Sequence, residues 1–305
     1  MTVLDWGIVA FVLALVLWGF REGVLAGGLI ALVAVGFVWA FGVAALHAPV
    51  ATELRHDVRR SLILRSLDQV LPPSETVIRA LRRIDPAPEV SGAPPPMIPP
   101  DPSISSDPDV QQAGDSVVRV YGTACGLGLE GSGWAARPDL VVTNAHVIAG
   151  EDDTTVTTRD GASLEATAVH YDPINDLALL HVGTELPALP LAPDPRYGAV
   201  AAVLGYPGNG PYSVVPARFG ETRDAVSDDS YGRGPLHRSV SSLRGNVRSG
   251  NSGGPLVDGR GRVMGTVFAA TTTGVPGGFA VPNEIVRAAL DGARRLAVDT
   301  GPCVG

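Results

Sequence analysis

The first 48 residues are almost wholly apolar and fall into two runs. Trp6–Phe20 is an apolar run of 15 residues, and Val24–Leu46 is a run of 23 residues without a charge. About 20 apolar residues suffice for a helix to span a bilayer. A signal peptide carries positive charge before its apolar core, whereas here Asp5 precedes the core and the first arginine, Arg21, follows it. The pattern therefore predicts a transmembrane α-helical hairpin over 1–48.

The pattern becomes amphipathic and then proline-rich over the next 60 residues. Leucine and valine recur at helical spacing from 51 to 71 with arginines around them, and Ser74 can cap a second short helix. We expect these helices, 49–84, either to lie on a membrane surface or to form a solvated connector. Residues 85–108 contain nine prolines, which is typical of an extended, semi-rigid linker.

From residue 109 to the end, short β-branched runs alternate with turns rich in glycine, proline and aspartate. This pattern predicts an all-β fold, a barrel or a sandwich, closed by a helix over Asn283–Ala297. The predicted strands are Ser116–Tyr121, Leu140–Thr143, Leu177–Val182, Val200–Leu204 and Arg262–Phe268.

Charge and motif content exclude several classes of function. The formal net charge is −8 at pH 7, which argues against nucleic acid as a partner. The sequence shows no metal-ligand cluster, P-loop or dinucleotide-binding fingerprint, so we expect neither a metal nor a cofactor.

A serine with glycines around it is the first candidate for chemistry. Ser252 lies in the stretch Arg248–Leu256, with Gly253 and Gly254 directly behind it. Glycine permits the tight turn that exposes a nucleophilic hydroxyl. The backbone N–H groups of Gly250 and Ser252 are then placed to form an oxyanion hole.

A serine nucleophile needs a base, and the base needs an orienting group. His146 follows the β-branched run Leu140–Thr143 in a small-residue turn, and Asp176 precedes the apolar strand at Leu177. The order His146, Asp176, Ser252 is the order of the chymotrypsin fold rather than that of subtilisins or α/β-hydrolases. Asp172 is the alternative for the acidic position.

The motifs around these three residues resemble those of a known family. Ser132–Trp134 with Thr143–Val147, then Asn175–Leu180 and Gly250–Leu256, resemble trypsin-like proteases of the bacterial HtrA-like branch. The resemblance implies a chymotrypsin/trypsin-like double β-barrel over 109–305 and serine endopeptidase activity on peptides or proteins. It also places Asn246, Phe268, Ala269 and Ala270 near the substrate pocket, whose lack of charge favours an uncharged P1 residue.

The N-terminal region is similar to a second family. Leu4–Trp6 and Gly19–Gly23 resemble the start of the CvpA (colicin V production) membrane domain. A CvpA-like segment joined to a trypsin-like domain resembles the MarP family of membrane-anchored periplasmic serine proteases, which normally have four transmembrane helices rather than two. That resemblance implies a role in surviving acid or oxidative stress in the cell envelope.

If Arg21 marks a cytoplasmic turn, both ends of the two-span hairpin face outward, so we expect the 109–305 domain outside the cytoplasm. Seven arginines follow the second span, however, and positive residues prefer the cytoplasmic side; a single-span arrangement would place the domain inside. Cys125 and Cys303 are the two cysteines. In an exported protein such a pair usually forms a disulfide, and two unrelated thiols are the alternative.

Two other functions remain open from the sequence. One is a non-catalytic, CvpA-like membrane scaffold or channel whose protease-like domain only binds peptides. The other is a soluble HtrA-like chaperone-protease.

Overall fold

The computed structural model describes residue 90 and residues 97–124, 127–151, 153–271 and 275–303. The predicted hairpin over 1–48 and the amphipathic helices over 49–84 lie outside these residues. Within the described ranges, no helix combines the length and the apolar character that crossing a bilayer requires.

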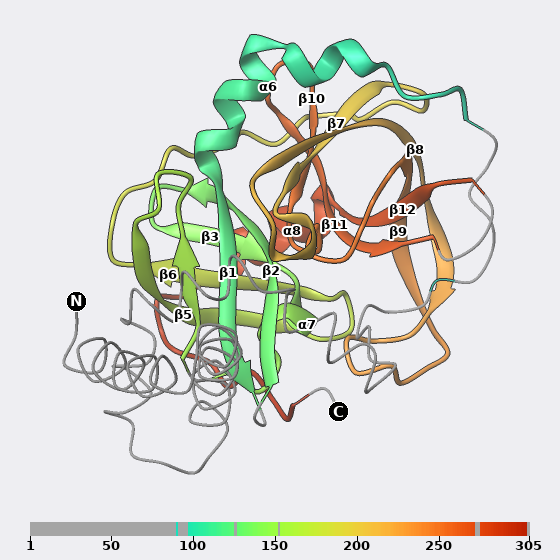
Figure 1. The fold of residues 1–305 in the computed structure, drawn as a ribbon. Helices are drawn as coiled ribbons and strands as arrows, with labels where there is room; N and C mark the ends of the chain where they lie inside the picture. Colours follow the sequence, from blue (N-terminus) through green and yellow to red (C-terminus); the bar gives the residue numbers. More distant parts are fainter. Residues whose placement is uncertain (1–89, 91–96, 125–126, 152, 272–274, 304–305) are drawn as a thin grey trace, which may run out of the picture. The chain divides into compact units, whose positions relative to one another are not determined.

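Two closed antiparallel β-barrels form the body of the described chain, which confirms the prediction of an all-β double barrel. Figure 1 shows the first barrel in green and yellow-green and the second in yellow to red. The first has the order β1-β2-β3-β6-β5-β4, from β1 (Val117–Ala124), β2 (Leu127–Arg137), β3 (Leu140–Thr143), β4 (Thr155–Thr157), β5 (Ser163–Asp172) and β6 (Leu177–Val182). The second has the order β10-β11-β12-β9-β8-β7, from β7 (Val200–Gly205), β8 (Ser213–Ser227), β9 (Leu236–Gly245), β10 (Pro255–Asp258), β11 (Val263–Ala270) and β12 (Gly277–Pro282).

Strands β3 and β6 are apolar at nearly every position because both of their faces are buried. Alternate side chains of a strand point to opposite faces. Val141 and Leu180 join the cluster that fills the first barrel, whereas Val142 and Leu179 join the cluster that lies between the barrels. The continuous apolar runs in the sequence therefore mark the strands nearest the centre of the molecule.

A tryptophan joins the two barrels at the centre of this second cluster. Trp134 of β2 is completely buried, and its indole Nε1 donates to Oγ1 of the buried Thr266 of β11 at 3.1 Å. The indole thus has its polar atom satisfied while its ring fills the inter-barrel space. This contact fixes the first barrel against the second, and the candidate site residues come from both.

The last part of the predicted linker is folded onto the second barrel. Residues 102–116 form η1 (Pro102–Ser106), α6 (Pro108–Ala113) and η2 (Gly114–Ser116). Ile104 and Val110 are buried in the inter-barrel cluster, and Arg218 of β8 donates to the carbonyl of Pro99 at 3.1 Å. The expectation of an extended linker is therefore wrong for 97–108, because these apolar side chains dock on the barrel.

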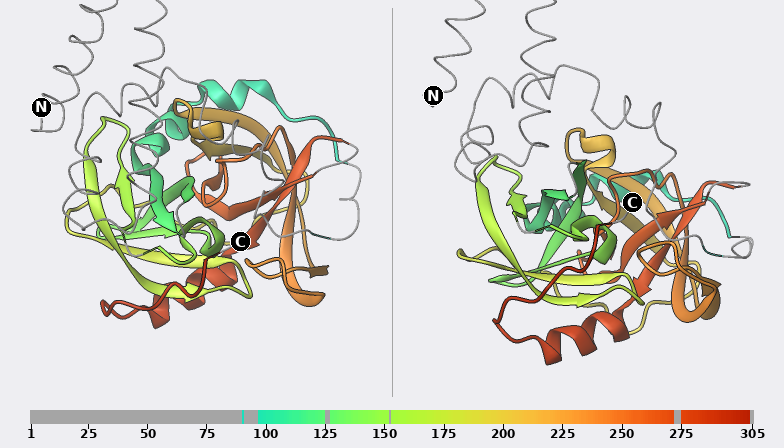
Figure 2. Two further views of the ribbon diagram at one scale, coloured as in Figure 1. Left: turned by 60° about the horizontal axis from the view of Figure 1, so that its bottom comes forward. Right: turned by 90° about the horizontal axis from the view of Figure 1, so that it is seen from below.

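The final helix is shorter than predicted, and the chain after it returns to the first barrel. Helix α8 spans Asn283–Gly292 rather than Asn283–Ala297, and Leu296 is 68% exposed. The N–H of Val298 then donates to the carbonyl of Ala168 at 2.9 Å. Figure 2 shows this C-terminal segment running along the first barrel.

Candidate active site

His146 lies on a short helix that follows directly from the buried strand β3. The helix, α7, spans Ala145–Ile148, and the His146 side chain is buried. Nδ1 of His146 lies 2.7 Å from Oδ2 of Asp176, and the backbone N–H of His146 donates to Oδ1 of the same carboxylate at 2.9 Å. A carboxylate only accepts, so the proton lies on Nδ1 and Nε2 is left as a base.

Asp176 ends the turn between β5 and β6 and is completely buried. Its φ of 56° lies in the left-handed region, which aspartate tolerates better than most residues. The alternative acid, Asp172, accepts the N–H groups of Ile174 and Asn175 at 3.0 Å each and the Asn175 amide at 2.6 Å. Asp172 therefore shapes the turn, and Asp176 is the carboxylate that holds His146.

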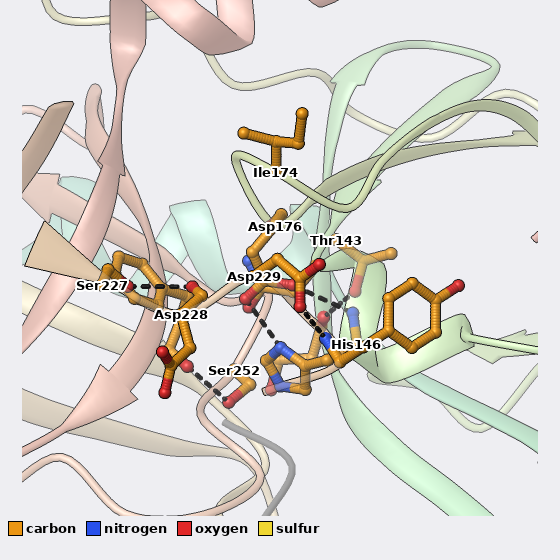
Figure 3. A network of polar contacts seen from close by, with 12 residues as sticks. Thr143, His146, Ile174, Asp176, Ser227, Asp228, Asp229 and Ser252 are labelled. Carbon is orange, nitrogen blue, oxygen red and sulfur yellow. Dashed lines mark hydrogen bonds and ion pairs between the residues drawn. The ribbon is translucent and has the colours of Figure 1, made fainter. Parts of the chain in front are cut away.

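Ser252 lies on the turn before β10, next to the helix that carries His146. Its carbonyl accepts the N–H of Ser132 at 2.8 Å, and a Cβ on the following Gly253 would lie 3.2 Å from the Asn144 nitrogen. In the view of Figure 3, the Ser252 hydroxyl points away from the His146 ring. The hydroxyl donates to the carbonyl of Phe268 at 3.4 Å, and among the described residues it forms no bond with His146. Rotation about the Cα–Cβ bond of Ser252 is therefore needed to bring the hydroxyl onto Nε2.

The N–H groups of Gly250 and Ser252 lie on this turn, and an oxyanion hole requires two donors that are free to bind a substrate oxygen. Within the described chain neither donates to a protein atom. The N–H groups of Asn251, Gly253 and Gly254 all do, to the carbonyls of Arg248, Val267 and Asn251 respectively. The turn therefore leaves the two N–H groups of Gly250 and Ser252 free to donate, while its other N–H groups are bonded to backbone carbonyls.

One hydrogen bond fixes the direction of the first of these donors. The carbonyl of Ser249 accepts the N–H of Gly208 at 2.8 Å; Gly208 belongs to the short helix η3 (Pro207–Asn209). Because the C=O and N–H of a trans peptide point in opposite directions, this bond turns the Gly250 N–H away from η3. Gly250 itself has φ 85°, and a Cβ there would lie 2.5 Å from the Tyr206 carbonyl oxygen.

A buried serine outside the predicted site residues supports the same turn. Ser132 of β2 donates its hydroxyl to the carbonyl of Gly250 at 2.7 Å and accepts the N–H of Tyr206 at 2.9 Å. Its own N–H holds the Ser252 carbonyl, as described above. The local signal was the Ser132–Trp134 motif itself, although nothing in that motif names the atoms to which Ser132 bonds.

The predicted pocket residues differ in what they can offer a substrate. Asn246 is exposed, Ala269 is buried and Ala270 is half-buried. The Phe268 ring is completely buried and packs 6.4 Å from the Phe279 ring centroid, so this residue presents its backbone rather than its ring. The assignment of these four residues to the pocket stays a prediction.

The cysteine prediction falls partly outside the described residues, because Cys125 is not among them. The segment before Cys303 packs beside α7: the Thr300 carbonyl accepts the N–H of Gly150 at 3.1 Å, and the Thr300 hydroxyl donates to the Glu151 carbonyl at 2.8 Å. The C-terminal segment thus supports the end of the helix that carries His146.

Several known proteins are similar to this chain in sequence and in fold. The trypsin-like peptidase domain family matches residues 131–265. Serine protease Rv3671c of Mycobacterium tuberculosis (strain ATCC 25618 / H37Rv) is 41% identical over 196 residues, which are 62% of this chain and 49% of that protein. The chain therefore spans about half the length of this curated relative. The mitochondrial serine protease HTRA2 of Bos taurus is 32% identical over 162 residues, 52% of this chain and 34% of that protein.

Solved structures agree with these matches. The crystal structure of the Rv3671c protease from M. tuberculosis in its active form superposes with a TM-score of 0.66 at 40% identity, covering 71% of this chain and 99% of that chain. The HtrA-type protease AlgW with a tripeptide superposes with a TM-score of 0.52 at 28% identity, covering 60% and 61%. From this likeness in sequence and fold, the chain belongs to the trypsin-like serine proteases, as a homologue of Rv3671c in the MarP family.

Proposed function

We propose that this protein is a membrane-anchored, extracytoplasmic serine endopeptidase that cleaves peptide bonds through Ser252, His146 and Asp176. The observation that carries the proposal is the His146 imidazole, held by the Asp176 carboxylate, facing a turn that presents the Ser252 hydroxyl and two unengaged N–H groups. Its substrates are peptides or proteins of the cell envelope, and no cofactor takes part.

In the acylation step, Nε2 of His146 takes the Ser252 proton as Oγ attacks the scissile carbonyl carbon. The carbonyl oxygen becomes an oxyanion that accepts the N–H groups of Gly250 and Ser252. Asp176 stabilises the imidazolium that forms. The tetrahedral intermediate then collapses, the C–N bond breaks, and His146 returns the proton to the leaving amine.

Water completes the cycle by the same route. His146 takes a proton from a water molecule as the water oxygen attacks the acyl carbon. The second oxyanion accepts hydrogen bonds from the same two N–H groups. Collapse then breaks the ester bond to Ser252, and His146 returns the proton to Oγ. The enzyme is restored, and the carboxylic acid product leaves.

Replacing Ser252 with alanine should abolish covalent labelling by a fluorophosphonate probe, because the probe forms its bond to a nucleophilic serine Oγ. Gel fluorescence of the full chain measures the labelling. Ser163→Ala, which removes an exposed hydroxyl at the start of β5, should label like the wild type. Labelling that survives in Ser252→Ala would place the nucleophile elsewhere, and a wild-type chain that never labels would favour the non-catalytic, peptide-binding alternative.

The membrane anchor is proposed from the 23-residue apolar run Val24–Leu46. A helix of that length is retained by the bilayer through its apolar surface, which salt does not weaken. The protein should therefore stay in the membrane fraction after washing with high salt or alkaline carbonate, as followed by immunoblotting. Full release by salt would favour the soluble alternative. In intact spheroplasts, added protease should digest the 109–305 domain; protection until lysis would contradict an extracytoplasmic position.

The Cys125–Cys303 disulfide is proposed from the pairing of two cysteines in an exported chain. Mass spectrometry of the isolated, unfolded protein should show no alkylated cysteine before reduction and two after it. Two alkylated cysteines without reduction would show that the thiols are separate.

A role in acid or oxidative stress of the envelope, and a preference for an uncharged P1 residue, complete the proposal. The first rests on the MarP-family resemblance and the second on the uncharged Asn246, Ala269 and Ala270. Survival of a strain lacking this protein at low pH or under peroxide tests the first. Cleavage of a peptide library tests the second, and a dominant P1 arginine or aspartate would contradict it.

A further inference from the structure

Arg238 of β9 is a buried arginine that the catalytic steps above do not use. The residue as a whole is only 5% exposed. Nε and Nη2 donate to the Ser227 hydroxyl at 3.2 and 3.0 Å, and Nη1 donates to the Ile174 carbonyl at 3.2 Å. The guanidinium carbon lies 4.3 Å from the centroid of the Phe268 ring. Among the described residues no carboxylate lies within ion-pair distance of it, which is costly for a buried charge.

The three groups that Arg238 contacts come from different parts of the site. Ile174 belongs to the turn of the first barrel that ends at Asp176. Ser227 ends β8, and Phe268 belongs to β11, whose carbonyl at this position accepts the Ser252 hydroxyl. One side chain of the second barrel therefore holds the turn that carries the acid of the triad, and covers the strand beside the nucleophile. Figure 3 labels Ile174, Asp176, Ser227 and Ser252, which come from both barrels.

The charge of Arg238 acts on the same region. Burial lowers the pKa of the guanidinium, and the nearby carboxylates oppose that shift, Asp176 most strongly. Arginine nevertheless stays protonated in proteins. The ionisable groups that surround it are Asp172 and Asp176 in the turn, and Asp228 and Asp229 after β8. Asp229 forms an ion pair with Arg233 at 2.8 Å, and Asp172 accepts hydrogen bonds within its own turn. Among the described residues, the Asp176 carboxylate bonds only to His146.

We propose that Arg238 is a positioning residue of the proposed triad, acting by both its geometry and its charge. Its guanidinium holds the Ile174–Asp176 turn against β8 and β11, so that the carboxylate stays aligned with the imidazole. Its buried positive charge stabilises the Asp176 anion and opposes the addition of a second positive charge beside it. We therefore expect loss of the Arg238 charge to change the pH dependence of catalysis. This inference rests on the proposed function, because it concerns the same three residues.

The test compares two substitutions that separate geometry from charge. Arg238→Met keeps most of the length and removes the charge; Arg238→Lys keeps a charge but lacks the planar array of donors that reaches Ser227 and Ile174 together. Arg262→Met is the matched control, because Arg262 pairs with Asp258 at 2.7 Å in the β10–β11 turn, away from the triad. The profile of kcat/KM against pH is measured for each full-length variant, with circular dichroism to follow folding.

We expect Arg238→Met to lower the plateau of kcat/KM about tenfold and to move its acid limb upward by about 0.5 to 1 pH unit. Arg238→Lys should lower the plateau but leave the acid limb within about 0.2 units of wild type, since a comparable charge remains. Arg262→Met should change neither. An unmoved acid limb in Arg238→Met, equal shifts in both variants, or an unchanged plateau in Arg238→Lys would overturn the proposal. If Arg238→Met fails to fold, Arg238→Lys still tests the proposal. A lower plateau with an unmoved acid limb supports it, and an unchanged plateau overturns it.

A readout without turnover separates this inference from the proposed function. In the Ser252→Ala background, ¹⁵N-histidine labelling of the full chain follows the protonation of His146 by NMR. Its titration midpoint should rise in Arg238→Met by the same amount as the acid limb, and should not rise in Arg238→Lys. A midpoint that stays in place would overturn the role of the charge, even if Ser252 proved to be the nucleophile. A midpoint that moves would support it, even if activity came from another group.

Discussion

Replacing Asp176 with asparagine is expected to lower kcat about 10⁴-fold while the protein stays folded. Both oxygens of this carboxylate accept hydrogen bonds, one from the His146 backbone N–H and the other from Nδ1. An asparagine can accept only one of the two. Since the backbone N–H cannot change, the amide nitrogen faces the ring, and the ring then carries its proton on Nε2, where it cannot accept the Ser252 proton.

Two features of the structure make this substitution a clean test. Asparagine tolerates the left-handed backbone as aspartate does, so the φ of 56° at this position is kept. The two side chains also have nearly the same volume, so packing around the turn is unchanged. Steady-state kinetics with a peptide substrate measures the loss, and circular dichroism follows folding.

Asp172→Asn provides the control four residues away. Its oxygen can still accept the N–H groups of Ile174 and Asn175, so the turn should persist and kcat should fall less than about tenfold. A loss in Asp172→Asn as large as that in Asp176→Asn would contradict the assignment of the acid to Asp176.

Elements whose character depends on burial of their own residues are visible in the sequence, whereas elements held by contacts between distant residues are not. Strands β3 and β6 have the predicted bounds because both of their faces are buried, which leaves a continuous apolar run. Strands β8 and β9 were not predicted individually. Their sequences mix charged and apolar residues, because the two strands are buried only in part. Backbone hydrogen bonds along a long register pair them with each other, and this pairing leaves no pattern in the sequence.

Residues 97–108 were predicted to be an extended linker but dock on the second barrel. Nine prolines over 85–108 favour an extended chain, and local sequence gives no sign that Ile104 and Val110 dock in the inter-barrel cluster. Helix α8 ends early for a similar reason: the chain after Gly292 runs along the first barrel, where the Val298 N–H donates to the Ala168 carbonyl. Helical spacing does not report such a long-range contact.

The site divides in the same way. His146, Asp176 and Ser252 stand in short motifs, so their order and surroundings could be read directly. Ser132 and Arg238 act through partners that are 118 and 64 residues away, and a serine or an arginine in a strand carries no local sign of such a partner. The fold is therefore needed to find the residues that contact the proposed triad, whereas the three proposed residues could be predicted from their motifs.

Gly250→Ala is the second change with a large expected effect, because it moves one of the two donors of the proposed oxyanion hole. A Cβ at this position would lie 2.5 Å from the Tyr206 carbonyl oxygen and 2.7 Å from the Gly208 nitrogen, both backbone atoms. Alanine also disfavours the φ of 85° by about 1 kcal/mol or more. The turn must therefore shift, which breaks the Ser249–Gly208 hydrogen bond and reorients the Gly250 N–H.

We expect kcat to fall about 10²- to 10³-fold, as when one oxyanion donor is removed. KM should change little, because the oxyanion forms only after the ground state. A peptide boronic acid, which forms a tetrahedral adduct with the serine, should lose affinity in parallel with kcat. A variant that loses substrate binding and boronate binding equally would indicate a collapsed pocket instead.

Gly208→Ala is the matched control across the same hydrogen bond. Gly208 also has a positive φ, 62°, but a Cβ there meets no atom within 4 Å, and its N–H remains available to Ser249. Its cost should therefore be confined to about 1 kcal/mol of stability, with kcat within about threefold of wild type, equivalent to less than 1 kcal/mol. If Gly208→Ala impaired kcat as severely as Gly250→Ala, strain in the turn, and not the loss of the Gly250 donor, would account for both.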